Sequence, residues 1–410
     1  MDSNREADQG RETLPQQEWH LRVLAHAFCQ PRLALSAYVL GALLVLASLG
    51  CRVGPEASGT IQAVLVDSLM LEETDSVFVG RTGGLAVDDR RRILVADAVA
   101  NALLEFDSTG RFGRRYGAAG RGPGEFRGIG DAILSRADGQ LTLTDYSLRR
   151  VTTFHRDDGR LLGTRAFDGK LGSLAGADGR IWYGIFDPVN ARAVAVEQFA
   201  GLVTTDTTPI QASLVAIPKE YLTVESLNGI YGFASVVAWG DTAFVGFAAS
   251  PFLLLVTADG AVVDTVPLPA RTRRGVPPNL AAILSDVSLP LTEMYRAASG
   301  LMRLHRRSDG SVVTIHHDTE IAGRLLSARV FAGVIAPDRS RACMDAEIPV
   351  SSDAIPWTAM QDDLLFVLDH VVDDDAPRPR LMVRAYRLDT SECSWTPLQG
   401  DVPLTGGVKR

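Results

Sequence analysis

The chain has 410 residues, of which 46% are hydrophobic and 22% are charged, and its formal net charge is −8. These values allow a large hydrophobic core and exclude general disorder, because the charged share is close to the usual value of about 25%. A mildly acidic chain without a basic tail also argues against a nucleic-acid partner, and we expect none.

The first element is an apolar stretch of 17 residues without a charge, residues 34–50. Its last residue is Gly50, and Cys51 follows. A bacterial lipoprotein signal peptide likewise ends in a small residue, which precedes the cysteine that takes the lipid. We therefore predict a signal peptide or membrane anchor over residues 1–51, with Cys51 as the lipid attachment site. An uncleaved anchor stays open, because a spanning helix needs about 17–25 residues.

Both alternatives place the folded part outside the cytoplasm. The residue after Cys51 is Arg52 rather than Asp, so for a Gram-negative host we predict an outer-membrane lipoprotein that faces the periplasm. The alternative is a single-pass inner-membrane anchor with an exported domain. Residues 52–59 are predicted to be a linker.

The rest of the chain repeats a unit of four short strands joined by tight turns. Asp-Gly or Thr-Gly pairs separate the apolar runs, as at Gly110, Gly139 and Gly159, and such pairs are hairpin signals. One further strand is predicted over residues 61–71, before the first unit. The inner strands of the six units are predicted to begin near Gly84, Asp131, Leu171, Ser235, Leu301 and Trp357.

Equivalent second-strand positions lie 48, 40, 61, 70 and 53 residues apart. Periods of about 40–50 residues with four strands each indicate a propeller. The predicted fold is therefore all-β, a six-bladed β-propeller of four-stranded antiparallel blades over residues 60–405. Residues 393–398 are predicted to be the fourth strand of the last blade, and residues 61–71 to close the ring beside it, because closure removes sheet edges.

The first repeat carries a family resemblance. It reads Ile93-Leu-Val-Ala-Asp97, then Leu103-Leu-Glu-Phe-Asp107, then Gly120-Arg-Gly-Pro-Gly-Glu-Phe126. This pattern resembles the NHL-type six-bladed β-propellers, and in particular the bacterial exported "6-bladed beta-propeller" proteins, many of which are lipoproteins. The resemblance is specific over residues 84–167 and weaker beyond. It implies a propeller with a binding role and does not supply a reaction.

The motifs that suggest chemistry favour structural roles. The glycines of residues 117–124 precede a strand pattern rather than a helix, so they indicate a turn between blades and not a phosphate loop. Asp97 and Asp145 end matching strands and are interpreted as acceptors for backbone N–H groups of the next turn. His316 and His317 are adjacent on a strand and point to opposite faces, which disfavours joint metal binding.

An enzyme of the gluconolactonase or paraoxonase type is the alternative function. Those propellers bind calcium with carboxylate and amide oxygens at the inner strand ends, and only Asp131 offers a carboxylate there. We therefore predict no catalytic residue, no metal and no cofactor. The predicted function is a monomeric binding or scaffold propeller of the cell envelope, whose partner is an envelope protein or an anionic ligand.

The longest insertion between blades, residues 268–300, supplies the candidate binding residues. It contains three arginines within four residues and a short helix predicted over residues 279–285. Guanidinium groups suit carboxylate or phosphate, whereas a solvated loop with ordinary surface arginines is the simpler interpretation. The candidate ligand-binding set is Arg271, Arg273, Arg274, Tyr295, Tyr231, Trp357 and Asp131, and Phe233 adds an apolar contact.

Two cysteines follow Cys51, at Cys343 and Cys393. A cysteine pair in an exported protein is more often bridged than free. The two occupy matching places in successive repeats, however, and matching places need not touch. A disulfide and two free thiols therefore both remain open.

Overall fold

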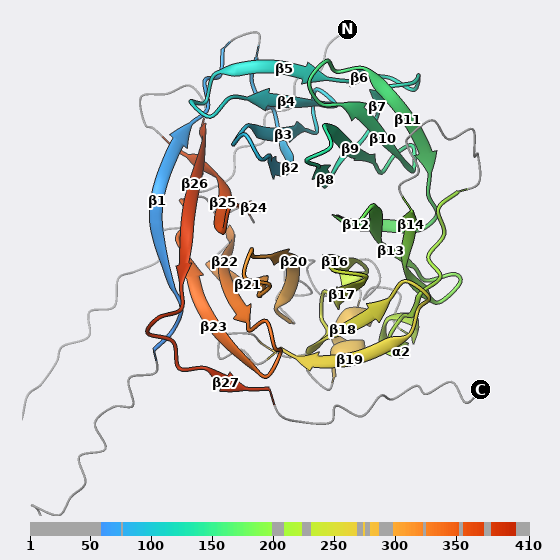
Figure 1. The fold of residues 1–410 in the computed structure, drawn as a ribbon, viewed down its shortest axis with the longest axis vertical. Coiled ribbons are helices and arrows are strands. Elements are labelled where there is room, and N and C mark those ends of the chain that lie inside the picture. Colours follow the sequence, from blue (N-terminus) through green and yellow to red (C-terminus); the bar gives the residue numbers. More distant parts are fainter. Residues whose placement is uncertain are drawn as a thin grey trace, which may run out of the picture. The chain divides into compact units, whose positions relative to one another are not determined.

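The computed structural model describes residues 59–74, 77–198, 209–223, 231–268, 274, 279–286, 298–322, 325–351, 356–372 and 379–398. These residues form six antiparallel sheets around a central axis (Figure 1). Two short helices lie among them, α2 (Lys219–Thr223) and α4 (Leu280–Ser285). Helix α4 confirms the short helix predicted in the long insertion.

The first sheet shows how the sequence builds a blade. Its inner strand is followed by two fully buried strands and an outer strand whose residues are mostly exposed. The buried strands lack polar alternation because neighbouring sheets cover both of their faces. The strands are β2 (Thr82–Val87), β3 (Ile93–Asp97), β4 (Ala102–Phe106) and β5 (Phe112–Tyr116).

Three more blades have the same order from the axis outward. The second contains β8 (Ile129–Ser135), β9 (Gln140–Asp145), β10 (Arg150–His155) and β11 (Leu161–Ala166). The third contains β12 (Lys170–Ala177), β13 (Arg180–Asp187), β14 (Arg192–Gln198) and β15 (Val215–Ala216). The fourth contains β16 (Ala234–Trp239), β17 (Thr242–Phe247), β18 (Phe252–Thr257) and β19 (Val262–Pro267).

The last two blades depart from this pattern. Blade five has a fifth strand at its outer edge, and the outer strand of blade six comes from the start of the described chain. Blade five contains β20 (Gly300–Arg306), β21 (Val312–Ala322), β22 (Leu325–Ile335), β23 (Arg341–Ile348) and β27 (Thr396–Pro397). Blade six contains β24 (Trp357–Gln361), β25 (Leu364–Val371), β26 (Arg380–Asp389) and β1 (Gln62–Met70).

Strand β1 closes the ring as predicted. It pairs antiparallel with β26 along its whole length, from Gln62 opposite Asp389 to Met70 opposite Met382. Figure 1 shows the two strands side by side, one from each end of the propeller sequence. The six-bladed β-propeller predicted from the repeats is therefore the fold of the described chain.

The segment after β26 corrects one prediction. Residues 393–398 were expected to be the fourth strand of blade six, but β27 pairs with β23 of blade five. The outer place in blade six is already filled by β1, so the chain passes on to the neighbouring sheet. A disulfide joins Cys343 on β23 to Cys393 just before β27, with 6.2 Å between their Cα atoms. The matching cysteines thus do touch, across two blades.

The hydrophobic core consists of six clusters, one between each pair of neighbouring blades. One of them joins blades one and six, through Leu85 and Leu368. Within the described residues, each blade therefore packs apolar side chains against both of its neighbours. The glycine-rich link contributes to the cluster between blades one and two, where Phe126 is fully buried. That link forms a short parallel pair, β6 (Ala118–Ala119) with β7 (Glu125–Phe126).

Candidate functional site

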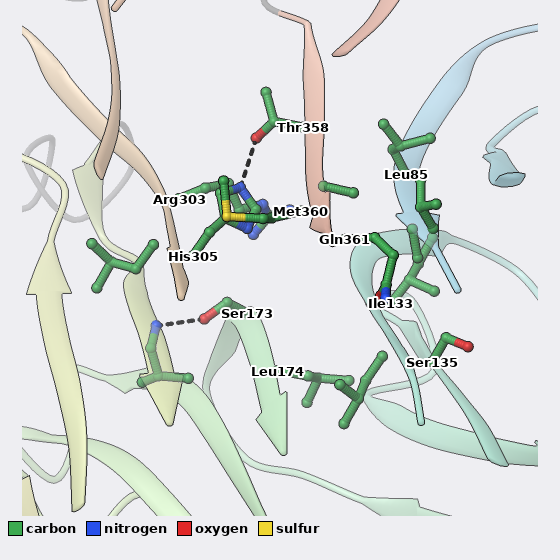
Figure 2. Close-up of a pocket in the computed structure, with 16 residues that line it drawn as sticks. Leu85, Ile133, Ser135, Ser173, Leu174, Arg303, His305, Thr358, Met360 and Gln361 are labelled. Carbon is green, nitrogen blue, oxygen red and sulfur yellow. Dashed lines mark hydrogen bonds between the residues drawn. The ribbon is translucent and has the colours of Figure 1, made fainter. Parts of the chain in front are cut away.

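A cavity of about 190 Å³ lies on the ring axis and is lined by the inner strands of all six blades (Figure 2). Aliphatic residues are the more numerous among the lining residues, but polar atoms form the larger part of the exposed wall, and the polar side chains come mainly from blades five and six. The lining residues are Leu85, Ala86, Val87, Ile133, Leu134, Ser135, Ser173, Leu174, Val236, Arg303, Leu304, His305, Thr358, Ala359, Met360 and Gln361. Small-molecule sites are concave and carry a few polar groups that fix the orientation of the ligand.

Strand β20 places two polar side chains in this cavity. His305 shares a hydrogen bond of 3.1 Å between its Nε2 atom and the Thr358 hydroxyl oxygen of β24. Burial, assisted by the positive charge of Arg303, lowers the pKa of His305 to about 3. The imidazole is therefore neutral at physiological pH and acts as a hydrogen-bonding group rather than a cation.

Arg303 reaches from blade five toward the opposite wall. Its Nη1 atom donates a hydrogen bond of 2.5 Å to the carbonyl oxygen of Gly172 on blade three. Its guanidinium carbon also lies 5.8 Å from the ring centre of Trp357 on blade six. Because blades three and five are not neighbours, this side chain must pass on the axis side of blade four.

Two serines contribute the remaining hydroxyl groups. The Ser173 oxygen accepts a hydrogen bond of 2.7 Å from the Val236 amide, which ties blade three to blade four. The Ser135 oxygen is buried and has no hydrogen-bond partner within the described part of the chain. Figure 2 shows Ser135 on the wall beside Ile133, away from Arg303. Since an unpaired buried hydroxyl is costly, a ligand or water that enters the cavity would gain a partner there.

Buried aspartates accept hydrogen bonds from backbone amides in the segments that connect strands and blades at one rim of the ring. Asp145 accepts backbone hydrogen bonds from Arg127 at 2.8 Å and from Leu148 at 2.9 Å. Asp97 accepts equivalent bonds from Val99 at 2.9 Å and Arg81 at 3.4 Å. Both side chains are buried, and the predicted turn-bracing role is confirmed for both.

The structure describes only some of the predicted binding residues. Arg271, Arg273 and Tyr295 lie outside the described residues, as do Cys51 and the side chain of Asp131.

Arg274, Tyr231 and Trp357 are described. Arg274 forms an ion pair with Asp318, with 2.7 Å between Nη2 and Oδ1, and its amide donates to the Ser299 hydroxyl. Tyr231 is buried, and its hydroxyl donates to the carbonyl of Ala298 at 3.0 Å. Both residues therefore brace the links near the rim, whereas Trp357 lies beside Arg303.

His316 and His317 have separate surroundings, as their position on one strand predicts. The His316 ring stacks on Phe331 with 5.3 Å between ring centres. His317 is buried against Gly300, and burial lowers its pKa to about 4. Across the described residues, no group of three or more His, Cys, Asp or Glu side chains is arranged to hold a metal ion.

The sequence analysis did not predict that Arg303, His305 and Thr358 lie together at the ring axis. The available signal was a pair of polar residues at alternate positions of the predicted inner strand that begins near Leu301. A register shift between Leu301 and Arg303 changes which side chains face the axis, and the sequence does not reveal such a shift.

The described chain is thus a six-bladed β-propeller with an axial cavity, and comparison with known proteins agrees with this fold. Residues 60–233 match the family model DUF5128, described as a 6-bladed beta-propeller. No curated protein sequence matches this chain. Within the described residues, no helix has the length and hydropathy needed to cross a membrane.

Several solved structures have a similar fold. A member of the DUF4221 family from Bacteroides vulgatus is 10% identical, with a TM-score of 0.55 over 81% of this chain and 99% of that chain. A protein from Bacteroides fragilis, described as exported, is 12% identical, with a TM-score of 0.52 over 81% of this chain and 96% of that chain. A gluconolactonase from Xanthomonas campestris is 14% identical, with a TM-score of 0.42 over 82% of this chain and all 100% of that chain. At these identities the likeness to the two Bacteroides proteins concerns the fold alone.

Proposed function

We propose that this chain is an exported, non-catalytic binding propeller that takes a small organic ligand into its axial cavity. The observation that carries the proposal is the cavity itself, which all six inner strands line and whose wall combines aliphatic side chains with the polar groups of Arg303, His305 and Thr358. Such a mixed wall suits a small organic molecule that forms hydrogen bonds. The binding role implied by the NHL-type resemblance supports the same conclusion.

Export and anchoring belong to the same proposal. The disulfide between Cys343 and Cys393 supports an oxidising compartment, where such bonds persist. We propose Cys51 as the lipid attachment site and the periplasmic side of the outer membrane as the location. In a Gram-negative host, Cys51→Ser should abolish labelling by a radioactive fatty acid. Unchanged labelling of this variant would overturn the lipid anchor and leave the cavity proposal intact.

A calcium-dependent lactonase remains the alternative. Calcium prefers several oxygen ligands from carboxylates, amides and carbonyls. Among the described side chains that line the cavity, none is a carboxylate, and Gln361 contributes an amide. This wall therefore favours an organic ligand over a hard cation. Lactone hydrolysis by the purified protein that is lost on adding a chelator would favour the alternative instead.

Binding is tested with a fragment library that contains neutral and carboxylate versions of the same small rings. Fragments are screened against the purified protein by ligand-observed NMR. Ser135→Phe is the blocking variant, because it fills the cavity from the wall, and Asp138→Ala in the following exposed turn is the control. We expect bound fragments to be lost in Ser135→Phe and retained in the control. A library without any hit that Ser135→Phe removes would refute a ligand cavity.

A further inference from the structure

We propose that the loops at one rim of blades one and two form a docking surface for a peptide segment of another protein that carries both carboxylates and apolar side chains. Four arginines and two apolar residues define this surface, which we call the basic rim patch: Arg81, Val99, Arg121, Arg127, Tyr146 and Arg149. None of them lines the axial cavity, so the proposal is independent of the small ligand proposed above. The patch also differs from the long insertion that the sequence suggested.

Hydrogen bonds join the loops of blade one to the link between the blades. The Ala98 amide, in the loop after β3, donates to the carbonyl of Arg81 at 2.9 Å. In the same loop, the side-chain oxygen of Asn101 accepts a bond of 3.4 Å from the amide of Ile129. Figure 1 shows the two blades side by side, with β6 and β7 between them.

The loop of blade two is bonded to the same link. The Tyr146 amide, in the loop after β9, donates to the carbonyl of Gly128 at 2.9 Å. The Nη1 atom of Arg150 donates to the carbonyl of Arg121 at 3.3 Å. The basic rim patch is therefore one continuous surface, built from loops that hold one another in place.

The four arginine side chains of the patch are exposed, and none forms an ion pair or a hydrogen bond within the described part of the chain. Two carboxylates lie beneath them, Asp97 and Asp145, but both are buried and accept bonds from backbone amides. Glu125 likewise accepts a bond from the Gly122 amide at 2.7 Å. The patch thus presents unpaired positive charge on a chain whose net charge is −8.

The hairpins at the other end of the strands provide a contrast. Four arginines there are also exposed, but each has a carboxylate partner at 3.1–3.7 Å: Arg90 with Asp157, Arg91 with Asp362, Arg111 with Glu72, and Arg160 with Asp158. The patch lacks such partners, and a guanidinium fork binds both oxygens of a carboxylate. Complementary charge therefore favours an acidic partner at the patch.

Two apolar side chains lie among these charges. Val99 is 62% exposed and Tyr146 is 39% exposed. A Cβ atom added at Gly130 would lie 2.1 Å from the Tyr146 ring, so this ring rests on the glycine backbone. Tyrosine and arginine are enriched in protein interfaces. A peptide with acidic and apolar residues would use both kinds of contact, whereas a simple polyanion would use only the charges.

The point at which the N-terminal segment joins the ring favours a protein partner over an anionic membrane surface. Gln62, at the start of β1, pairs with Asp389 at the hairpin end of β26, and the Gly59 carbonyl accepts a bond of 2.8 Å from the Ser394 amide. The segment that leads to the proposed lipid site therefore joins the ring at the end of the strands opposite to the patch.

The test uses the purified full-length protein and a random peptide library displayed on phage. The most enriched peptide is synthesised, and its dissociation constant is measured by fluorescence anisotropy at increasing salt. The patch variant replaces the four arginines of the basic rim patch by Gln, and the control variant does the same to Arg90, Arg91, Arg111 and Arg160. Both variants remove the same number of positive charges, from opposite ends of the strands.

We expect the enriched peptides to combine Asp or Glu with aromatic or aliphatic residues. The patch variant should bind the synthetic peptide at least about tenfold more weakly, which corresponds to about 1.4 kcal/mol, and with a shallower salt dependence. The control variant should retain both the affinity and the salt dependence. Tyr146→Ala should weaken binding and leave the salt dependence unchanged, because it removes only an apolar contact.

Several results would overturn the docking surface. They are enrichment of peptides without carboxylates, an equal loss of affinity in the patch and control variants, or no enrichment at all. Binding to phosphatidylglycerol vesicles that only the patch variant loses, without an enriched peptide, would show a lipid-binding surface and refute the protein partner. Thermal melting shows whether each variant is folded. If the patch variant does not fold, the single variants Arg127→Gln and Arg149→Gln replace it, and unchanged affinity in both would refute the role of the arginines.

Discussion

The closing strand offers the sharpest test of how the ring is held together. Its two flanking residues are buried in different clusters. Ile61 packs between blades five and six, and Leu71 packs between blades six and one. Leu65, in the middle of the same strand, is 53% exposed, whereas Leu71 is 1% exposed. The two leucines therefore form a pair, six residues apart, that differs strongly in burial.

We predict that Leu71→Ala destabilises the protein by about 2–5 kcal/mol, the range for leucine-to-alanine changes in a core. Leu71 contacts the cluster that contains Leu85 of blade one and Leu368 of blade six, so the cavity left behind lies at the closure. Leu65→Ala should change the free energy of unfolding by no more than about 0.5 kcal/mol, as surface changes usually do. Ile61→Ala should behave like Leu71→Ala, because Ile61 is 3% exposed.

The assay is equilibrium unfolding in urea with the disulfide oxidised, followed by tryptophan fluorescence. The midpoint of Leu71→Ala should fall well below that of Leu65→Ala, with similar slopes. Equal midpoints for the two leucine variants would refute the claim that this strand seals the core between the last and first blades.

Two further predictions concern stability. Asp145→Ala should cost at least about 2 kcal/mol, because it leaves the amides of Arg127 and Leu148 without their acceptor, whereas Asp138→Ala in an exposed turn should cost about 0.5 kcal/mol or less; urea midpoints that do not separate the two variants would contradict the bracing role. His317 has a folded-state pKa lowered to about 4, below its ordinary value of about 6.5, so the unfolded chain binds its proton first and stability should fall as pH decreases from about 6.5 to about 4. His317→Gln should flatten that part of the stability profile measured by urea unfolding, and an unchanged slope would argue against a buried neutral imidazole.

The sequence determined the repeating part of this protein because that part depends on local chemistry. Four-residue turns at Asp-Gly pairs and short apolar runs predicted the six inner strands, which begin at Thr82, Ile129, Lys170, Ala234, Gly300 and Trp357. The bracing roles of Asp97 and Asp145 also followed from their positions just before a turn. Each of these features involves residues close together in the chain, so their types and spacing are sufficient.

The axial cavity and the contacts between blades were decided only by the tertiary structure. Gly172 and Arg303 are 131 residues apart in the chain, and Cys343 and Cys393 lie on segments that meet only because β1 occupies the outer place of blade six. A bulge near Leu301 determines how β20 faces the axis. Closure brings distant inner strands to a common axis. The cluster of polar side chains around Arg303 and His305 therefore forms only in the closed ring.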